Sequence, residues 1–517
     1  MITEVAPGVD TRPERDTDRR TIGRTLVLVT VVVGAAVAAV LLHRNGHTQG
    51  DDFALYLRQA RSLFDGDIGD VIADNRFSVV NSGPVFSPIA YPWGWPLMLA
   101  PFVNRWGLDY DRLKLLEVAA FCIWLVLIHG IVRRRAGRLL ALAVTAVVAT
   151  APAFLVHTDQ LLSEYPHAAV VAAFIWWMDR IKVRRPLIGA TTRELVLLGL
   201  LAAAAFNVRR ESVVLVTVIM VVQVVELVGI RRGQPPVPVP WRTVAAPYAT
   251  FVAAVVGFQL LLPSMLFPDT GDGPRYVPDR LGDYAGVLTE QLGLGRHPLL
   301  GTIVLLLAAA GMVVGCIRRP RLDIPLTALT VLSTVAVSTH FRMVGRYYFQ
   351  VTPWVLYFAG AAIAAAAAAL LPRHRQRLAP AFAAVPLVFL VAVHLAVLPG
   401  DIADAREFDR AGRQQVGPTD PRVMPIYDAI EEHTAPTDVV AYFRARTMTL
   451  LTDRLTIQTT NMDRILQRAD WFAQQRSSSY YQPDIDEAEA AELGLEEVWS
   501  DSRWILWRVP ESTDVQD

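Results

Sequence analysis

Two adjacent aspartates, Asp51 and Asp52, follow closely on an apolar run that ends at Leu42. A carboxylate at the edge of a membrane can act as a general base that removes the proton of a hydroxyl group. Aspartate is also among the best residues for capping a helix, so Asp52 could equally begin a helix and do no chemistry. The apolar residues that follow have the spacing of an amphipathic helix in the membrane interface: Phe53, Leu57, Ala60 and Phe64.

Arginines that could bind an anion occur in two short segments between apolar runs. FNVRRES contains Arg209 and Arg210, and HFRMVGRYYFQVTPW contains Arg342, Arg346 and Tyr347. A guanidinium group presents a planar fork of donors that matches a phosphate, so the two segments predict a phosphate-binding surface. Snorkelling of the arginines to lipid headgroups is the alternative, and it requires no substrate.

Glu164 and Tyr91 complete the set of candidate substrate-binding residues. Glu164 stands in SEYPH at the start of an apolar segment, where it could complement a helix dipole or orient an arginine or a sugar hydroxyl. Tyr91 lies in SPIAYPWGWPLMLAPF, whose four prolines predict that residues 87–102 form no continuous helix. Its aromatic residues are typical of a membrane surface, where they would anchor the chain or form a wall along a lipid-borne substrate.

No set of metal ligands can be assigned from the sequence. Cys122 and Cys316 lie in apolar runs, and no histidine spacing indicates a zinc site. The stretch 267–298 predicts a mobile flap with a helix. Three of its aspartates could contact a metal or a sugar, although aspartates also form turns: Asp269, Asp272 and Asp279. The cofactor expectation is therefore limited to an assisting divalent cation, Mg²⁺ or Mn²⁺, with no ligands named.

A series of apolar segments must position these residues. The chain has 517 residues, of which 53% are hydrophobic, and seven runs are of roughly bilayer-spanning length. Four further segments bring the expected number of spans to eleven, with an uncleaved signal anchor as the first. The predicted fold class is mainly α-helical and polytopic. The spans are expected at 26–42, 115–132, 139–156, 165–178, 195–206, 213–230, 244–266, 299–317, 324–339, 351–371 and 381–398.

The charge distribution predicts how the spans are oriented. Alternate connections are basic, as the positive-inside rule requires of the cytoplasmic side: 133–138, 180–185, 231–242, 318–321 and 373–377. Residues 401–517 contain 23 acidic and 12 basic residues and fall on the opposite side. We therefore expect both aspartates, the candidate arginines and the C-terminal residues to lie outside the cytoplasm.

Three domains are expected. A cytoplasmic tail (1–21) precedes a transmembrane domain (22–399) with two large outer loops, 43–114 and 267–298. A small extracytoplasmic α/β domain (400–517) follows. Within that domain, PIYDAIEEH is typical of a helix and DVVAYF and RWILWRV of strands, while the acidic DIDEAEAAELGLEE predicts one solvated helix.

Five motifs, in their order and shared sidedness, resemble the GT-C superfamily of polytopic glycosyltransferases: DDFALYLRQARSLFDGD, YPWGWPLMLAP, SEYP, VRRES and GRYYFQVTPW. Its members take sugars from polyprenyl-phosphate donors on the extracytoplasmic face and include protein O-mannosyltransferases and actinobacterial arabinosyltransferases. The family aspartate stands four residues before a tyrosine, which matches Asp52 and Tyr56. The resemblance therefore makes Asp52 the first choice for the catalytic base and Asp51 the second.

The resemblance implies transfer of a sugar, with inversion, from a polyprenyl-phosphate donor to a glycan, lipid or protein acceptor. The composition is typical of an actinobacterial source, where the plasma membrane and a decaprenyl-phosphate donor for cell-wall synthesis would be expected. We expect membrane lipids as further partners, and no nucleic acid. Two other classes stay open: a flippase with charges near the midplane, and a non-catalytic scaffold whose C-terminal domain binds a glycan.

Overall fold

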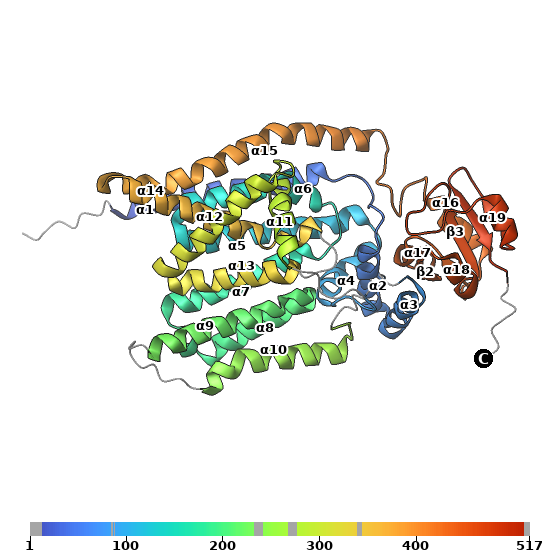
Figure 1. Cartoon of the computed structure of the whole chain (residues 1–517), viewed down its shortest axis with the longest axis horizontal. Coiled ribbons are helices and arrows are strands. Elements are labelled where there is room, and N and C mark those ends of the chain that lie inside the picture. Colours follow the sequence, from blue (N-terminus) through green and yellow to red (C-terminus); the bar gives the residue numbers. More distant parts are fainter. Residues whose placement is uncertain are drawn as a thin grey trace, which may run out of the picture.

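The protein is described by a computed structural model that covers residues 13–83, 86, 88–231, 241–266, 277–338 and 344–510. Its long helices run side by side in one bundle, and a domain of helices and strands lies beyond one end of that bundle (Figure 1). The long helices are α1 (Pro13–Leu42), α5 (Tyr110–Thr150), α7 (Glu164–Arg184), α8 (Thr192–Val208), α9 (Val214–Arg231), α10 (Trp241–Leu261), α12 (Pro298–Arg318), α13 (Pro320–Ser338), α14 (Thr352–Leu370) and α15 (Ala379–Arg410).

Eight of the described helical segments are long and apolar enough to cross a membrane, and the chain is a multi-pass membrane protein. Helix α5 contains the predicted span 115–132 and most of the span 139–156, which continues into α6 (Pro152–His157). The two helical parts of α5 meet at a kink at Gly137, within the connection expected at 133–138. The backbone φ of Gly137 is 78°, a left-handed conformation that glycine adopts without steric strain. The total of eleven spans stays a prediction.

Glycines allow two close contacts between helices. Gly311 on α12 faces α14, where an added Cβ would lie 1.9 Å from the carbonyl oxygen of Phe358. Gly94 begins α4 (Gly94–Trp106), and a Cβ there would lie 2.5 Å from the carbonyl oxygen of Asn207. Small residues are what membrane helices use for such contacts. A side chain at position 94 would therefore push α4 away from the end of α8.

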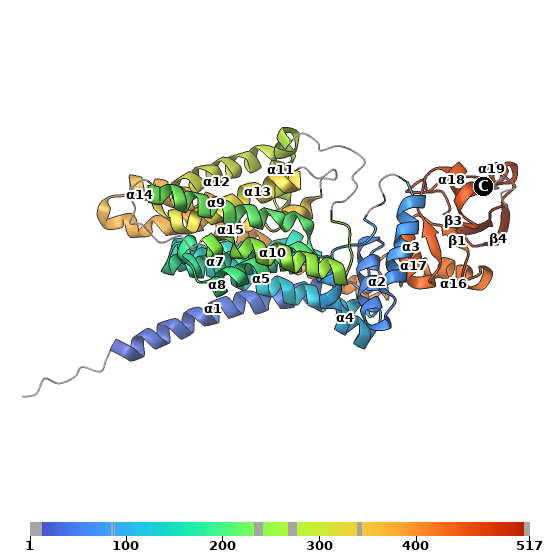
Figure 2. The same ribbon diagram turned by 90° about the horizontal axis from the view of Figure 1, so that it is seen from below.

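Short helices gather at the end of the bundle that faces the C-terminal domain (Figures 1 and 2). They include α2 (Asp52–Asp65), α3 (Ile68–Asn81) and α4, whereas the turn η4 (Arg373–Leu378) between α14 and α15 lies at the other end. The remaining short elements are α6 (Pro152–His157), η1 (Leu187–Gly189), η2 (Arg210–Val213), α11 (Val277–Gln291) and η3 (Gly345–Tyr348).

No continuous helix covers residues 87–102, but the prolines do not prevent a helix from residue 94 onward. Helix α4 contains Pro96 in its first turn, where the missing N–H needs no helical partner, and also Pro101 in its interior. The neighbouring Trp93 and Trp95 are buried within the protein. The Trp93 indole N–H donates to the carbonyl oxygen of Pro263, 2.8 Å away. Burial of this segment therefore replaces the expected contact of both tryptophans with the membrane surface.

The C-terminal domain is built on a five-stranded sheet with the strand order β2-β1-β3-β5-β4. Strand β1 pairs in parallel with β2 and β3, whereas β5 pairs antiparallel with β3 and β4. The long helix α15 passes through the boundary predicted at residue 400 and ends at Arg410. The elements are α16 (Met424–His433), β1 (Val439–Ala441), α17 (Ala445–Thr452), β2 (Leu455–Ile457), α18 (Met462–Arg468), β3 (Trp471–Gln475), α19 (Glu487–Glu492), β4 (Glu496–Ser500) and β5 (Trp504–Arg508).

One expected element of this domain is only half right. The acidic segment DIDEAEAAELGLEE was predicted as one helix, but α19 covers only Glu487–Glu492. Gly494 follows with a φ of 72°, a left-handed conformation that is common just after a helix. The last two glutamates of the segment, Glu496 and Glu497, then pair with β5 as the start of β4.

Candidate active site

Helix α2 carries the aspartate pair at its beginning. Asp52 is the first residue of the helix, and Asp51 stands at the N-cap position without a side-chain capping hydrogen bond. The amphipathic pattern is present as expected, but its apolar face packs against α4: Phe53, Tyr56, Leu57 and Ala60 contact Trp95, Leu99 and Val103. The helix start is therefore fixed by packing, and the two carboxylates are left for other contacts.

Asp52 lies between a tyrosine and an arginine. The Tyr91 hydroxyl donates to Asp52 Oδ1 at 2.5 Å, and Arg346 Nη2 lies 3.4 Å from Asp52 Oδ2. The Asp52 side chain remains 39% exposed. Burial, with the nearby Asp52 carboxylate, raises the pKa of the Tyr91 phenol well above its usual value, so this hydroxyl stays a donor. A carboxylate held in place yet still accessible can accept a proton from a substrate.

Glu164 joins two of the candidate arginines. Its Oε1 accepts from Arg346 Nε at 2.8 Å and from Arg209 Nη1 at 3.1 Å, and the side chain is 5% exposed. Tyr347 lies beneath both cations, with the Arg209 and Arg346 guanidinium carbons 4.9 and 5.4 Å from its ring centroid. We refer to Asp52, Glu164, Arg209 and Arg346 as the outer cluster.

Arg209 and Arg210 diverge although they are neighbours in the sequence. Arg209 points into the outer cluster, where its Nε also donates to Glu211 Oε1 at 2.5 Å. Arg210 turns away and donates to the carbonyl oxygens of Phe206 at 3.2 Å and Met265 at 3.3 Å. The structure therefore brings one of the two together with Asp52. Arg342 lies outside the described residues.

Asp51 points away from the outer cluster, towards the C-terminal domain. Arg444 Nη1 lies 3.3 Å from Asp51 Oδ2, and the backbone N–H of Arg446 donates to Asp51 Oδ1 at 3.2 Å. Burial raises the pKa of the Asp51 carboxyl above its usual value although both arginines oppose the shift. Sequence reasoning missed these two arginines, whose only signal was the pattern FRAR in an acidic domain.

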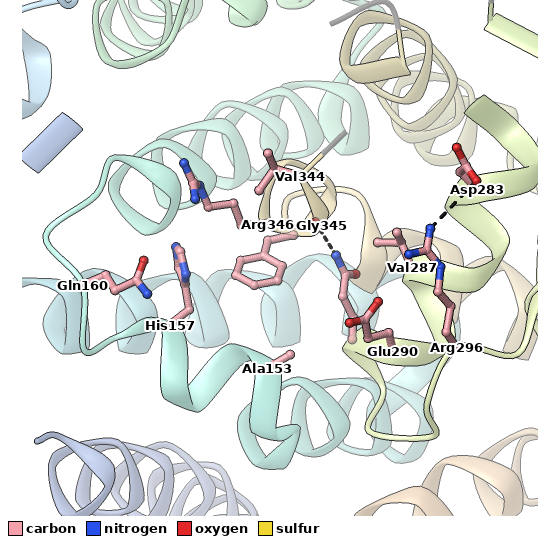
Figure 3. A pocket seen from close by; sticks show the side chains of 12 residues that line it. Ala153, His157, Gln160, Asp283, Val287, Glu290, Arg296, Val344, Gly345 and Arg346 are labelled. Carbon is pink, nitrogen blue, oxygen red and sulfur yellow. Dashed lines mark hydrogen bonds and ion pairs between the residues drawn. The ribbon is translucent and has the colours of Figure 1, made fainter. Parts of the chain in front are cut away.

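A cavity of about 500 Å³ adjoins the outer cluster. Arg346 forms part of its wall on the same side as His157 and Gln160, and Asp283, Glu290 and Arg296 lie on the other side (Figure 3). Asp52 lies outside the set of residues that line it, so Arg346 is the link between the aspartate and the cavity. Of these polar lining residues, only Arg346 was among the candidates predicted from the sequence.

Metal ligands were expected, if at all, among the aspartates of the stretch 267–298. Asp269 and Asp272 lie outside the described residues, as does the side chain of Asp279. In the described part of the chain, no group of three or more His, Cys, Asp or Glu residues is placed to hold a metal ion. We therefore derive no chemical step through a metal.

Comparisons with known proteins give matches in structure alone, since no protein-family model and no curated protein sequence matches the chain. One match is ArnT from Cupriavidus metallidurans bound to undecaprenyl phosphate. It has a TM-score of 0.56 and 13% identity over 96% of this chain and 99% of that one. The chain has the GT-C fold.

A second GT-C structure is the archaeal oligosaccharyltransferase AglB from Archaeoglobus fulgidus, in complex with an inhibitory peptide and a dolichol-phosphate. It has a TM-score of 0.52 and 12% identity over 87% of this chain and 69% of that one. At such identities the likeness concerns the fold. The fold that the five sequence motifs predicted is thereby confirmed.

Proposed function

We propose that this GT-C protein transfers a sugar from a polyprenyl-phosphate donor to an acceptor hydroxyl on the extracytoplasmic face of the plasma membrane. One observation carries the proposal. Asp52, held by Tyr91 and accessible to solvent, contacts Arg346, which lines a cavity large enough for a sugar. A base and a cation side by side are the two groups that displacement of a phosphate by a hydroxyl requires.

Asp52 acts as the general base. Its Oδ2 takes the proton of the acceptor hydroxyl as the hydroxyl oxygen attacks the anomeric carbon of the donor sugar. The Tyr91 hydroxyl, bonded to Oδ1 at 2.5 Å, leaves the other oxygen directed towards Arg346 and the approaching acceptor. General bases positioned in this way contribute about 10²- to 10⁴-fold to the rate.

Arg346 stabilises the leaving group, and Arg209 supports it. As the bond between the anomeric carbon and the phosphate oxygen breaks, the electron pair stays with the departing polyprenyl phosphate. The guanidinium groups neutralise this developing charge. Glu164 fixes both arginines before the donor arrives, because it accepts from Arg346 and Arg209 with the same oxygen. Little reorganisation is then required during the reaction.

We expect the transfer to invert the configuration at the anomeric carbon. A retaining reaction by a covalent intermediate would need a carboxylate free to attack the anomeric carbon. Glu164 is 5% exposed and paired with two arginines, which makes it a poor nucleophile. Asp52 as base therefore supports a single displacement, in which the acceptor enters opposite to the departing phosphate.

A lipid-borne donor suits the setting of the site. Nucleotide sugars made in the cytoplasm do not reach the outer face of a membrane, whereas a polyprenyl chain carries its sugar within the bilayer. The ArnT structure contains undecaprenyl phosphate and the AglB structure a dolichol-phosphate, which supports the same kind of donor here. The basic turn at 373–377 and the outer cluster belong to opposite ends of the bundle, in line with an extracytoplasmic site.

The test is an assay of the full-length protein in proteoliposomes. Decaprenyl-phosphoryl mannose and decaprenyl-phosphoryl arabinofuranose serve as donors, with an octyl glycoside as the acceptor. We expect glycosylated acceptor and free decaprenyl phosphate with the wild type, and neither with Asp52→Asn. Movement of a donor across the bilayer without product would instead indicate a flippase. An Asp52→Asn protein that forms product at the wild-type rate would refute the proposal.

A further inference from the structure

Helix α17 of the C-terminal domain is built into the candidate active site. Its first turn contacts the residues just before α2, where Thr447 Oγ1 donates to the carbonyl oxygen of Gly50 at 2.6 Å. In the same turn the Arg446 backbone N–H and the Arg444 side chain both bind Asp51. Three groups of the C-terminal domain therefore hold the residues at the start of α2.

The side chain of Arg446 reaches beyond Asp51. It is 4% exposed and donates from all three nitrogens: Nε to Asn75 Oδ1 at 2.9 Å, Nη2 to the Pro88 carbonyl at 2.7 Å, and Nη1 to the Tyr91 hydroxyl at 3.3 Å. Its guanidinium carbon also lies 4.5 Å from the ring centroid of Phe86. These contacts hold the planar guanidinium group of Arg446 in one orientation.

The contact with Tyr91 determines where the phenol proton goes. The Tyr91 oxygen accepts from Arg446, so its own hydrogen is left for Asp52 Oδ1, 2.5 Å away. A hydroxyl that accepts from a cation is also a stronger donor, because the two hydrogen bonds polarise each other. Two hydrogen bonds in the same direction, from Arg446 to Tyr91 and from Tyr91 to Asp52, thus lead from the C-terminal domain to the proposed base.

We propose that Arg446 is a positioning residue, which acts through Tyr91 to hold Asp52 in its reactive orientation and makes the C-terminal domain part of the active site. The inference rests on the proposed function, since it concerns the same reaction. It also separates the two adjacent aspartates: Asp52 takes the proton, and Asp51 binds the domain that aligns it.

A simpler role for Arg446 would be to hold the domains together without influence on the reaction. The two roles differ in their link to Tyr91. If Arg446 acts through the Tyr91 hydroxyl, removal of that hydroxyl makes the arginine unimportant for turnover. If it only joins the domains, its loss and the loss of the hydroxyl act independently, and their effects on kcat multiply.

The experiment compares Arg446→Lys, Tyr91→Phe and the double variant as full-length proteins in proteoliposomes, with whichever of the two decaprenyl-phosphoryl donors the wild type uses. Lysine keeps the charge but lacks the fork. We expect each single variant to lower kcat about 10- to 100-fold with a nearly unchanged donor KM, and the double variant to be no slower than the slower single one.

Arg508→Ala is the matched control, because Arg508 belongs to the same domain and forms an exposed pair with Glu496. It is expected to keep the wild-type kcat. The inference is overturned if Arg446→Lys keeps it as well, or if the effects of the two single changes multiply. Failure of the proposed function would give a different result. Either Asp52→Asn would retain activity, or the wild type would turn over neither donor.

Discussion

Two groups of paired charges lie at different depths in the bundle, and helix α7 carries one member of each. The outer cluster includes Glu164 at the start of α7, and Asp179 on the same helix belongs to the second group, about 22 Å further along at 1.5 Å per residue. There Arg135 Nη2 donates to Asp179 Oδ1 at 2.8 Å, and Arg135 Nε lies 3.2 Å from Asp323 Oδ1. We refer to Arg135, Asp179 and Asp323 as the inner cluster.

The two clusters differ in the exposure of their side chains. The three side chains of the inner cluster are 0% exposed, and Tyr357 adds a hydroxyl that donates to Asp323 Oδ1 at 2.9 Å. In the outer cluster Asp52 is 39% and Arg346 26% exposed beside a cavity. Charges that bind only each other hold helices together, whereas charges that also meet solvent can exchange a partner for a substrate.

Asp52→Asn is the sharpest test of this difference. The variant should lower sugar transfer by about 10²- to 10⁴-fold, since the amide cannot take up a proton. The midpoint of thermal unfolding in detergent should stay near that of the wild type, because a partly exposed side chain contributes little to stability. If the amount of folded protein fell together with the activity, the outer cluster would have a structural role, as the inner cluster has.

Asp179→Asn should have the opposite effect. The Arg135 guanidinium would lose a charged partner in a fully buried place, so the free energy of unfolding should fall by about 3–5 kcal/mol. Asp65→Asn is the control, since Asp65 pairs with Arg61 at the surface and should change stability by about 1 kcal/mol or less. Denaturant unfolding of all three proteins in micelles measures both effects. An Asp179→Asn protein as stable as the control would contradict a structural role.

Much of the fold could be predicted from the sequence, because it depends on local patterns. Apolar runs indicated the helices of the bundle, and the short apolar stretches DVVAYF and RWILWRV indicated β1 and β5. Arg135 shows the limit of such patterns. A connection between two spans was expected at 133–138, and the helix does kink there at Gly137, yet Arg135 from that basic segment is fully buried in the inner cluster.

The candidate site could be predicted only in part, because its pairings join distant segments. Sequence motifs indicated Asp52, Glu164 and Arg209. They did not show which of the neighbours Arg209 and Arg210 would lie beside Asp52. The orientation of both depends on what packs around a turn. Arg446 lies 355 positions from Tyr91, and the series of hydrogen bonds between them exists only once the C-terminal domain has docked. A local pattern contains no information on such a contact.

The neighbouring arginines provide a third and smaller test. Arg209→Lys should weaken binding of decaprenyl phosphate about tenfold, because lysine cannot bridge Glu164 and Glu211 as the guanidinium does. Arg210→Lys should leave this binding unchanged, since Arg210 contacts backbone carbonyls outside the outer cluster. Binding to each purified protein can be followed by native mass spectrometry. Equal effects of the two changes would show that the phosphate site is not confined to the outer cluster.

The smallest expected effect is that of acid on stability, through the loop that precedes Asp51 and Asp52. His47 is buried, and its Nε2 accepts from the backbone N–H of Leu161 at 3.1 Å. Burial lowers the pKa of His47 from about 6.5 to about 3, so the folded protein holds the neutral ring while the unfolded chain binds a proton below about pH 6.5. Stability from this group is therefore present above pH 6.5 and is lost as the pH falls towards 3, by at most about 1.4 kcal/mol per pH unit.

His47→Gln should reduce this loss, because the glutamine oxygen can accept from Leu161 without titrating. The slope of the unfolding midpoint between pH 6.5 and 4 should become shallower than in the wild type, while that of His374→Gln should not change. His374 is exposed in the basic turn at the other end of the bundle. Equal slopes in all three proteins would mean that the loop before Asp51 and Asp52 does not open in acid.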